Sequence, residues 1–546
     1  HRNTQINQEG GIDPEQFRVE SVMDRVNTFG TVFLGLTIGC AQCHDHKFDP
    51  ISQREYYQLY AFFNNTIEDG HGKGTPSGVL EITNEFEPKE NLQKEIEETG
   101  ADLERYLDTK GSEVTKWEAS LTEEARGKLK APVKTALKLR WSERKLEQKR
   151  AVYAAFNASD ADFKSRNAKL ARLEKSKAKP VTTLVMQELK QSRESTVFTK
   201  GDFTRPAEKV SPGVLGALHP LVVASEAPTN RLALARWLSQ PQNPVTARVI
   251  VNRIWQQYFG RGLVETENDF GTQGSAPTHP DLLDWLACEL MKPSIVGRGV
   301  LTAPGSGSLR TANPTTPWSL KHIHRLIVTS ATYRQSSRVR PELATLDPNN
   351  RLLARQSRLR LDAELVRDVA LSTSGLLSPK VGGPPVFPPQ PDGVMTLGQV
   401  KREWKPSTGG DRYRRALYTH VWRATPHPAL AVFDAADGFS TCTRRLRSNT
   451  PLQALTLLND QQFYEMAEAL AKRALKLPTK SERERIASTF RLCLGRAPST
   501  VEEQRLEHLL DQQTKQEPGD EQAKRAAAWT TLARVLLNLD ETITRE

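Results

Sequence analysis

The spacing of apolar residues is the feature that most constrains the fold of this chain. After Asp13-Pro14, which supply an N-cap and a first-turn proline, apolar side chains recur at i, i+3, i+4 and i+7. These are Val19, Val22, Met23 and Val26. The same spacing follows Asn243-Pro244 and continues to Gly260, and residues 279–290 show it again. The pattern predicts a mainly α protein.

Two short stretches depart from this pattern. Residues 181–186 (VTTLVM) and 195–203 (STVFTKGDF) are rich in β-branched residues and too short for stable helices. We expect them to form a small strand pair. The fold class is therefore mainly α, a multi-domain helical protein with a small β element.

A chain of 546 residues is too long for one hydrophobic core. Residues 1–75 contain short helices around a cysteine motif, and residues 76–180 read as a charged helical hairpin or small bundle. Residues 181–225 hold the β segment and a linker. Residues 226–475 form a helical domain interrupted by a loop at 292–317, and residues 476–546 form a C-terminal helical region.

Charge and hydropathy exclude two classes of partner. The net charge is +11, but the basic residues are spread along the chain without any nucleic-acid-binding motif, so we expect no nucleic-acid partner. No run of about 18 apolar residues occurs, which excludes a transmembrane segment in this chain.

One short motif points to a specific chemistry. Residues 39–46 read GCAQCHDH, which contains Cys40, Cys43 and His44 at the C-x-x-C-H spacing of covalent haem attachment. Two thiols about one turn apart can bond the two vinyl groups of a haem, and the adjacent histidine can ligate the iron. The motif predicts haem c on Cys40 and Cys43, with His44 as iron ligand.

Two alternatives for the motif stay open. Cys40, Cys43 and His46, with His71 or Asp49 as the fourth ligand, would make a tetrahedral zinc site. The motif can also be a turn that binds nothing. If haem is bound, the local candidates for the sixth iron position are Met23 and His71; His46 lies too close in sequence to reach the opposite face.

Other groups of polar residues carry weaker signals. Arg444, Arg445 and Arg447 precede a helix that starts near Asn449, so they form either an anion site or a salt-bridge cluster with Asp434 or Asp437. His322 and His324 lie two apart, on different faces of a helix, which argues against a metal pair. Residues 269–271 spell DFG, but no glycine-rich loop or H-R-D motif accompanies them, which excludes a kinase.

Longer strings resemble a known pair of domains. Residues 24–65, DRVNTFG through QLYAFFNN, resemble the end of the planctomycete cytochrome-associated domain of unknown function. NRLALARWLSQPQNPVTARVIVNRIWQQYFGRGLVETENDF and RRLRSNTPLQALTLLND are similar to its companion planctomycete-specific domain. The likeness covers most of residues 8–75 and 182–475. It implies an exported protein whose haem-binding triplet is Cys40, Cys43 and His44, and it implies no catalytic residues.

Two hypotheses follow. The first is an extracytoplasmic c-type haem protein that transfers electrons to or from an unidentified redox partner protein, with its export signal upstream of His1. The second is an extracytoplasmic binding or scaffold protein that holds an anionic glycan or a cell-surface partner near the arginines, with a structural Cys/His turn. Neither hypothesis assigns a catalysed reaction.

Overall fold

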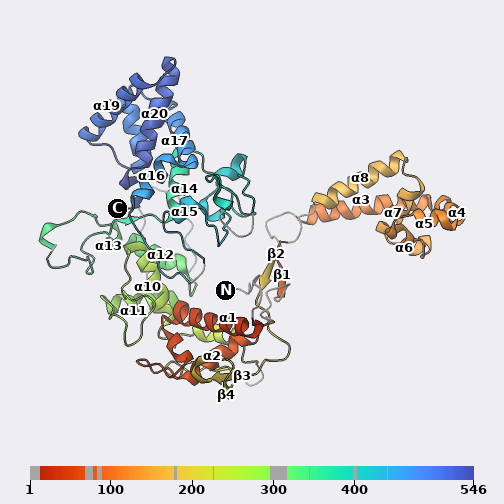
Figure 1. The fold of residues 1–546 in the computed structure, drawn as a ribbon, viewed down its shortest axis with the longest axis horizontal. Helices are drawn as coiled ribbons and strands as arrows, with labels where there is room; N and C mark the ends of the chain where they lie inside the picture. The colour runs from red at the N-terminus through yellow and green to blue at the C-terminus, as the bar shows by residue number, and fades with distance from the viewer. Residues whose placement is uncertain are drawn as a thin grey trace. The chain divides into compact units, whose positions relative to one another are not determined.

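The computed structural model describes residues 13–67, 78–82, 89–176, 181–224, 227–294, 316–343, 345–396, 402–438 and 441–545. The fold is mainly α, as predicted, and the strands of the described part form three two-stranded antiparallel sheets. The chain divides into two compact units, residues 1–18 with 66–192 and residues 19–65 with 193–546. Each is described by itself below (Figure 1). No described helix is long and apolar enough to cross a bilayer.

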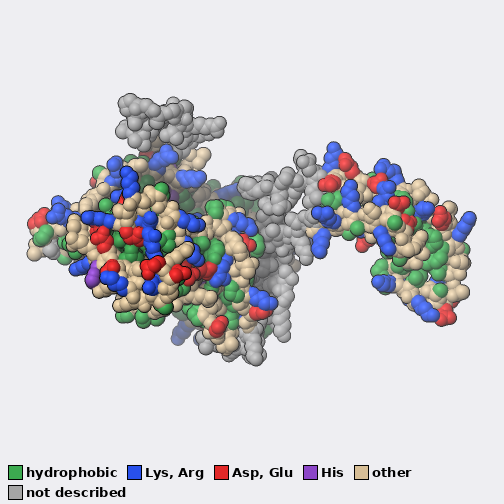
Figure 2. All heavy atoms as spheres, turned by 90° about the horizontal axis from the view of Figure 1, so that it is seen from above, with side chains coloured by type: hydrophobic (Ala, Val, Ile, Leu, Met, Phe, Trp, Pro, Cys, Tyr) green, Lys and Arg blue, Asp and Glu red, His purple; other side chains and the backbone are tan. Residues whose placement is uncertain are grey.

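The first unit contains a small bundle of charged helices. Its elements are β1 (Gly78–Ile82), α3 (Lys89–Thr109), α4 (Gly111–Ser120), α5 (Glu123–Lys128), α6 (Ala131–Ala136), α7 (Leu146–Phe156), α8 (Ala161–Ser176) and β2 (Val181–Val185). Helix α3 packs against α7 and α8 around buried Leu103, Leu107, Val152 and Phe163. Lys and Arg side chains alternate with Asp and Glu on the visible face (Figure 2), which suits a solvated surface.

The prediction that residues 181–186 pair with residues 195–203 is wrong, because each segment pairs with a different strand. Residues 181–185 do form a strand, but β2 pairs with β1, Val181 opposite Ile82. Residues 195–198 form β3, which pairs with β4 (Pro206–Val210) in the second unit, with a register shift between Thr196 and Phe198. Both stretches find a partner outside the pair because strand propensity shows that a segment extends, not what it faces.

The second unit begins with the helices that carry the cysteine motif. They are the last part of α1 (Pro14–Phe29), the π-helix η1 (Gly30–Leu34), the 3₁₀ helix η2 (Ile38–Gln42) and α2 (Gln53–Asn64). The four residues that predicted α1 are all buried, and they pack with α2, β3 and α9 (Arg231–Leu238) in one core. The aromatic face of α2, led by Tyr56 and Tyr60, is part of this packing and not the wall of a cavity.

A second group of helices follows. These are α10 (Thr246–Phe259), α11 (Pro280–Met291), α12 (Leu320–Thr329) and α13 (Ala331–Arg334). Gly260 ends α10 at φ +78°, a left-handed conformation that favours glycine. Ser319 caps α12, where the sequence predicts that helix resumes. Most of the predicted loop at 292–317 lies outside the described residues.

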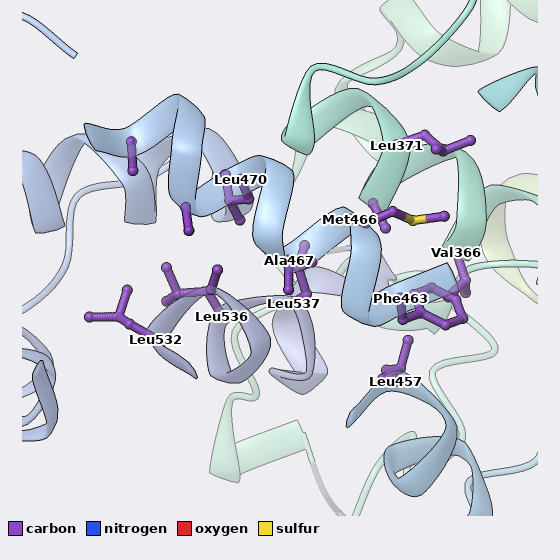
Figure 3. Packing of buried hydrophobic residues seen from close by; sticks show 14 of the residues in the cluster. Val366, Leu371, Leu457, Phe463, Met466, Ala467, Leu470, Leu532, Leu536 and Leu537 are labelled. Atoms are coloured by element: carbon purple, nitrogen blue, oxygen red, sulfur yellow. The ribbon is translucent and has the colours of Figure 1, made fainter. Parts of the chain in front are cut away.

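The C-terminal part of this unit is a larger helical bundle (Figure 1). It contains β5 (Leu359–Arg360), α14 (Ala363–Ser374), α15 (Pro428–Ala431), α16 (Pro451–Asn459), α17 (Gln461–Leu475), α18 (Glu482–Leu494), α19 (Thr500–Gln516), α20 (Glu521–Leu537) and β6 (Thr544–Arg545). Helix α17 packs against α14 and α20, with Phe463, Met466 and Leu470 in the seam (Figure 3). Strands β5 and β6 pair, which returns the C-terminal end to the start of α14.

Candidate functional site

The C-x-x-C-H motif lies on a short exposed turn. Ile38 and Ala41 anchor η2 in the core, while Cys40 and Cys43 are both exposed with free thiols. The amide of Cys43 lies 3.5 Å from the carbonyl oxygen of Cys40, so the two residues occupy one turn of helix. Both cysteines are therefore surface residues.

His44 is held in one tautomer by its own backbone neighbour. Its Nδ1 lies 2.7 Å from the carbonyl oxygen of Asp45. Because a carbonyl oxygen only accepts, Nδ1 carries the hydrogen and Nε2 keeps its lone pair. A histidine that binds a metal through one nitrogen typically donates the other N–H to a carbonyl or carboxylate. The exposed side chain of His44 has this arrangement.

His46 is a structural residue in the same stretch. Its side chain is only 4% exposed, and its Nδ1 accepts from the amides of Asp49 at 2.9 Å and Phe48 at 3.3 Å. Nδ1 is therefore engaged as an acceptor and closes the turn at residues 46–49. The spacing of the two histidines in the sequence does not show that Nδ1 of His44 donates whereas Nδ1 of His46 accepts.

Asp49 joins the motif to a distant loop. Its buried Oδ1 accepts from the amide of Thr272 at 2.7 Å and from the Thr272 hydroxyl at 2.9 Å. A Cβ on Gly271 would lie 2.4 Å from Asp49 Oδ2, so only glycine allows this approach. The amide of Phe270 donates to the carbonyl of Gly35 at 2.7 Å. Residues 269–271 therefore form a turn that packs against Gly35 and Asp49.

Part of the ligand set of the zinc alternative has hydrogen-bond partners within the chain. His46 Nδ1 and the Asp49 carboxylate already have partners, and His71 lies outside the described residues. Within the described ranges, no three His, Cys, Asp or Glu side chains gather as metal ligands would.

Helix α2 supports the motif from below. Ser52 and Glu55 form a capping box that starts α2. The amide of Gln53 donates to Asp45 Oδ1 at 2.7 Å, and its side chain donates to the carbonyl of Gln42 at 3.1 Å. The Tyr57 hydroxyl donates to the same carbonyl at 3.0 Å. Three hydrogen bonds from one helix therefore hold the turn.

The surroundings of Cys43 are crowded on one side. Burial, and then the nearby Cys43 and Tyr60, raise the pKa of Tyr57, so this phenol stays protonated. Gly201 has φ +78°, and a Cβ there would lie 2.7 Å from Cys43 Sγ. Any residue with a Cβ would therefore clash with the Cys43 sulfur, so this position requires glycine.

The donor set fits a covalently held haem on one side. Two free exposed thiols stand beside an exposed histidine whose tautomer leaves Nε2 for iron. Met23, a predicted candidate for the sixth position, is buried in the core with α2, so it is not presented to this surface. The other candidate, His71, lies outside the described residues.

The arginines of this cluster pair with acidic residues from other segments. Arg445 meets Glu364 through two bonds of 2.5 and 3.0 Å. The remaining pairs are Arg444 with Glu267 at 3.9 Å and Arg447 with Asp362 at 3.6 Å. Asp434 binds Arg360 instead at 2.5 Å. The salt-bridge interpretation holds, with partners that lie 81 to 177 residues away and that no local pattern marks.

The two histidines of α12 have separate partners. His322 Nε2 lies 2.8 Å from Glu289 Oε2, and His324 Nδ1 lies 2.9 Å from the Tyr258 hydroxyl. Each histidine thus contacts a different neighbouring helix, His322 with α11 and His324 with α10.

Comparison with protein families places most of the chain. Residues 230–510 match the family PSD1, described as Protein of unknown function (DUF1553). Residues 1–68 match the family PSCyt2, described as Protein of unknown function (DUF1549). No curated protein matches the chain, and no solved structure matches it. The PSCyt2 match ends at residue 68, four residues after the end of α2, so it includes the whole cysteine motif.

Proposed function

The chain belongs to the PSD1 family, here joined to PSCyt2 in the planctomycete cytochrome-associated pair, and from this we propose that it is a c-type haem protein that transfers electrons. Cys40 and Cys43 would hold the haem through thioether bonds, and His44 would ligate the iron. The observation that carries the proposal is the pair of exposed thiols next to a histidine whose Nδ1 is fixed on the carbonyl of Asp45.

A haem held at this turn would supply one-electron redox chemistry. The residues of the chain then have defined tasks. The carbonyl of Asp45 orients the imidazole of His44. The hydrogen bonds from Gln53 and Tyr57 to the carbonyl of Gln42 fix the backbone between the two cysteines. Haem on an exposed turn suits electron exchange with a protein partner, and covalent attachment suits an extracytoplasmic location.

Covalent attachment is tested on protein produced together with a haem-maturation system. We expect the intact mass to exceed that of the polypeptide by one haem, and the pyridine haemochrome spectrum to be that of thioether-linked haem. Replacement of both Cys40 and Cys43 by alanine should abolish the added mass. Cys288→Ala removes an exposed cysteine of α11 and is the matched control; it should retain the haem.

Metal analysis of the same sample separates the alternatives. One iron per chain with the added mass supports the proposal. A bare polypeptide mass, with or without one equivalent of zinc, would contradict it.

A further inference from the structure

A second feature lies away from the cysteine motif, at the place where α10, η1 and the β5–α14 segment meet. A cavity of about 510 Å³ opens there, within the size range of small-molecule sites. Its apolar wall comes from Val32, Ile254, Leu359, Leu361 and Leu365. A wall of this kind favours a ligand with an apolar body over an inorganic ion alone.

The charged side chains that line this cavity are mostly positive. Four arginines and one histidine meet a single aspartate: Arg253, Arg360, Arg447, Arg545, His324 and Asp362. A carboxylate that lies outside the lining, Asp434, neutralises Arg360. The guanidinium of Arg360 also donates to the carbonyls of Ser448 and Leu361, so most of its N–H groups already have acceptors.

Arg253 is bonded to neutral acceptors. Its guanidinium donates to the carbonyls of Val32 and Thr31, both at 2.5 Å, and to Asn268 Oδ1 at 3.3 Å. No ion pair of Arg253 occurs among the described residues, although the charge of Glu267 acts on it. Burial lowers its pKa below the ordinary value, which marks a cation that is poorly solvated.

Arg447 is paired only loosely. Its Nη2 lies 3.6 Å from Asp362 Oδ1, beyond hydrogen-bond distance, and both side chains line the cavity. An oxyanion placed beside Arg447 would therefore gain hydrogen bonds that Asp362 does not make. Arg545 adds a further positive charge, and its guanidinium donates to the carbonyl of Tyr258.

We propose that this cavity binds a small organic anion. A carboxylate or sulfonate-type head would lie beside Arg447 and Arg253, since guanidinium groups match such oxyanions in charge and shape. An aliphatic or aromatic body would pack on the leucine wall. The proposal is independent of haem, because none of the cavity's lining residues belongs to the cysteine motif.

The test uses three probes that share one body and differ in head group. These are 2-naphthalenesulfonate, 2-naphthoate and neutral 2-naphthalenemethanol, titrated by calorimetry into the full chain. We expect one of the two anions to bind one to one and at least tenfold more tightly than the alcohol. Preference between the anions identifies the head group. Equal binding of all three probes, or binding of neither anion, overturns the proposal.

Two variants locate the site. Arg447→Gln should weaken anion binding at least tenfold. Leu365→Glu should do the same by placing a negative charge at the cavity, and its position is 41% exposed, so the fold should tolerate it. The control is Arg444→Gln, a neighbouring arginine that does not line the cavity and should change affinity less than twofold. Equal losses in Arg444→Gln and Arg447→Gln would show surface attraction only and overturn the assignment.

Discussion

Two histidines two positions apart have opposite roles in the cysteine motif. His44 is exposed and orients its Nδ1 onto a carbonyl, whereas His46 is buried and accepts from the backbone. The two side chains differ in the hydrogen that each imidazole nitrogen carries, which the spacing does not show. The C-x-x-C-H spacing predicts His44 as the iron ligand, but the sequence had no signal for the amide bonds of His46.

Replacement of His46 tests this distinction. In protein without haem, His46→Ala should lower the free energy of unfolding by about 1–3 kcal/mol, because the buried amide of Asp49 loses its acceptor. His44→Ala, at an exposed position, should change it by less than about 0.5 kcal/mol. Urea unfolding measures both. A larger loss in His44→Ala than in His46→Ala would contradict the assignment.

A buried histidine elsewhere couples stability to pH. Burial lowers the pKa of His427 to about 4, and its Nε2 lies 2.9 Å from the carbonyl of Pro389. Between pH 6.5 and 4 the unfolded chain takes up a proton that the folded chain refuses. Stability therefore falls as the pH is lowered through this window.

The predicted effect of His427 is a loss of about 2–3 kcal/mol between pH 7 and 4.5. In His427→Gln this part of the loss should disappear, so the variant's stability should fall less steeply than that of the natural chain. His508→Gln, in the exposed part of α19, is the control and should keep the natural slope. Unfolding by urea at a series of pH values decides; parallel slopes in all three proteins would refute the role of His427.

Helices were the elements that the sequence predicted best, because their signals are local. The cap at Asp13 and the terminal glycine at 260 both depend on residues within one turn. Strand partners and arginine partners were missed for the opposite reason. β2 pairs with a strand about 100 residues earlier, and Arg445 with a glutamate 81 residues away.

The packing of α20 in the C-terminal bundle provides a test at this scale. Trp529 is completely buried, and its Nε1 donates to Glu482 Oε1 at 2.5 Å. Trp529→Ala should therefore lower the free energy of unfolding by about 3–5 kcal/mol. Trp285→Ala, in α11 at 48% exposure, should cost less than about 1 kcal/mol. Similar losses in the two variants would mean that α20 is not part of the main core.

At the scale of the whole molecule, each compact unit has its own buried core. The charged bundle is organised around Leu103 and Leu107, and the second unit around cores that include Leu470. Separate cores favour separate unfolding transitions.

Calorimetry should therefore show at least two transitions. Leu107→Ala should lower the temperature of one transition, and Leu470→Ala that of another, each at a cost of about 2–5 kcal/mol. The two variants serve as controls for one another. A single transition that both substitutions shift equally would mean that the units unfold together.

The hydrogen bonds between Asp49 and Thr272 cross the border between the two family matches. A polypeptide cut between these matches would leave a buried carboxylate without its donors on one side and the Gly35 carbonyl without the Phe270 amide. Residues 19–65 of the PSCyt2 match and all of the PSD1 match thus belong to one compact unit. We therefore expect the two regions to be inherited together, because exchange of one region alone would break the hydrogen bonds between Asp49 and Thr272 and between Gly35 and Phe270.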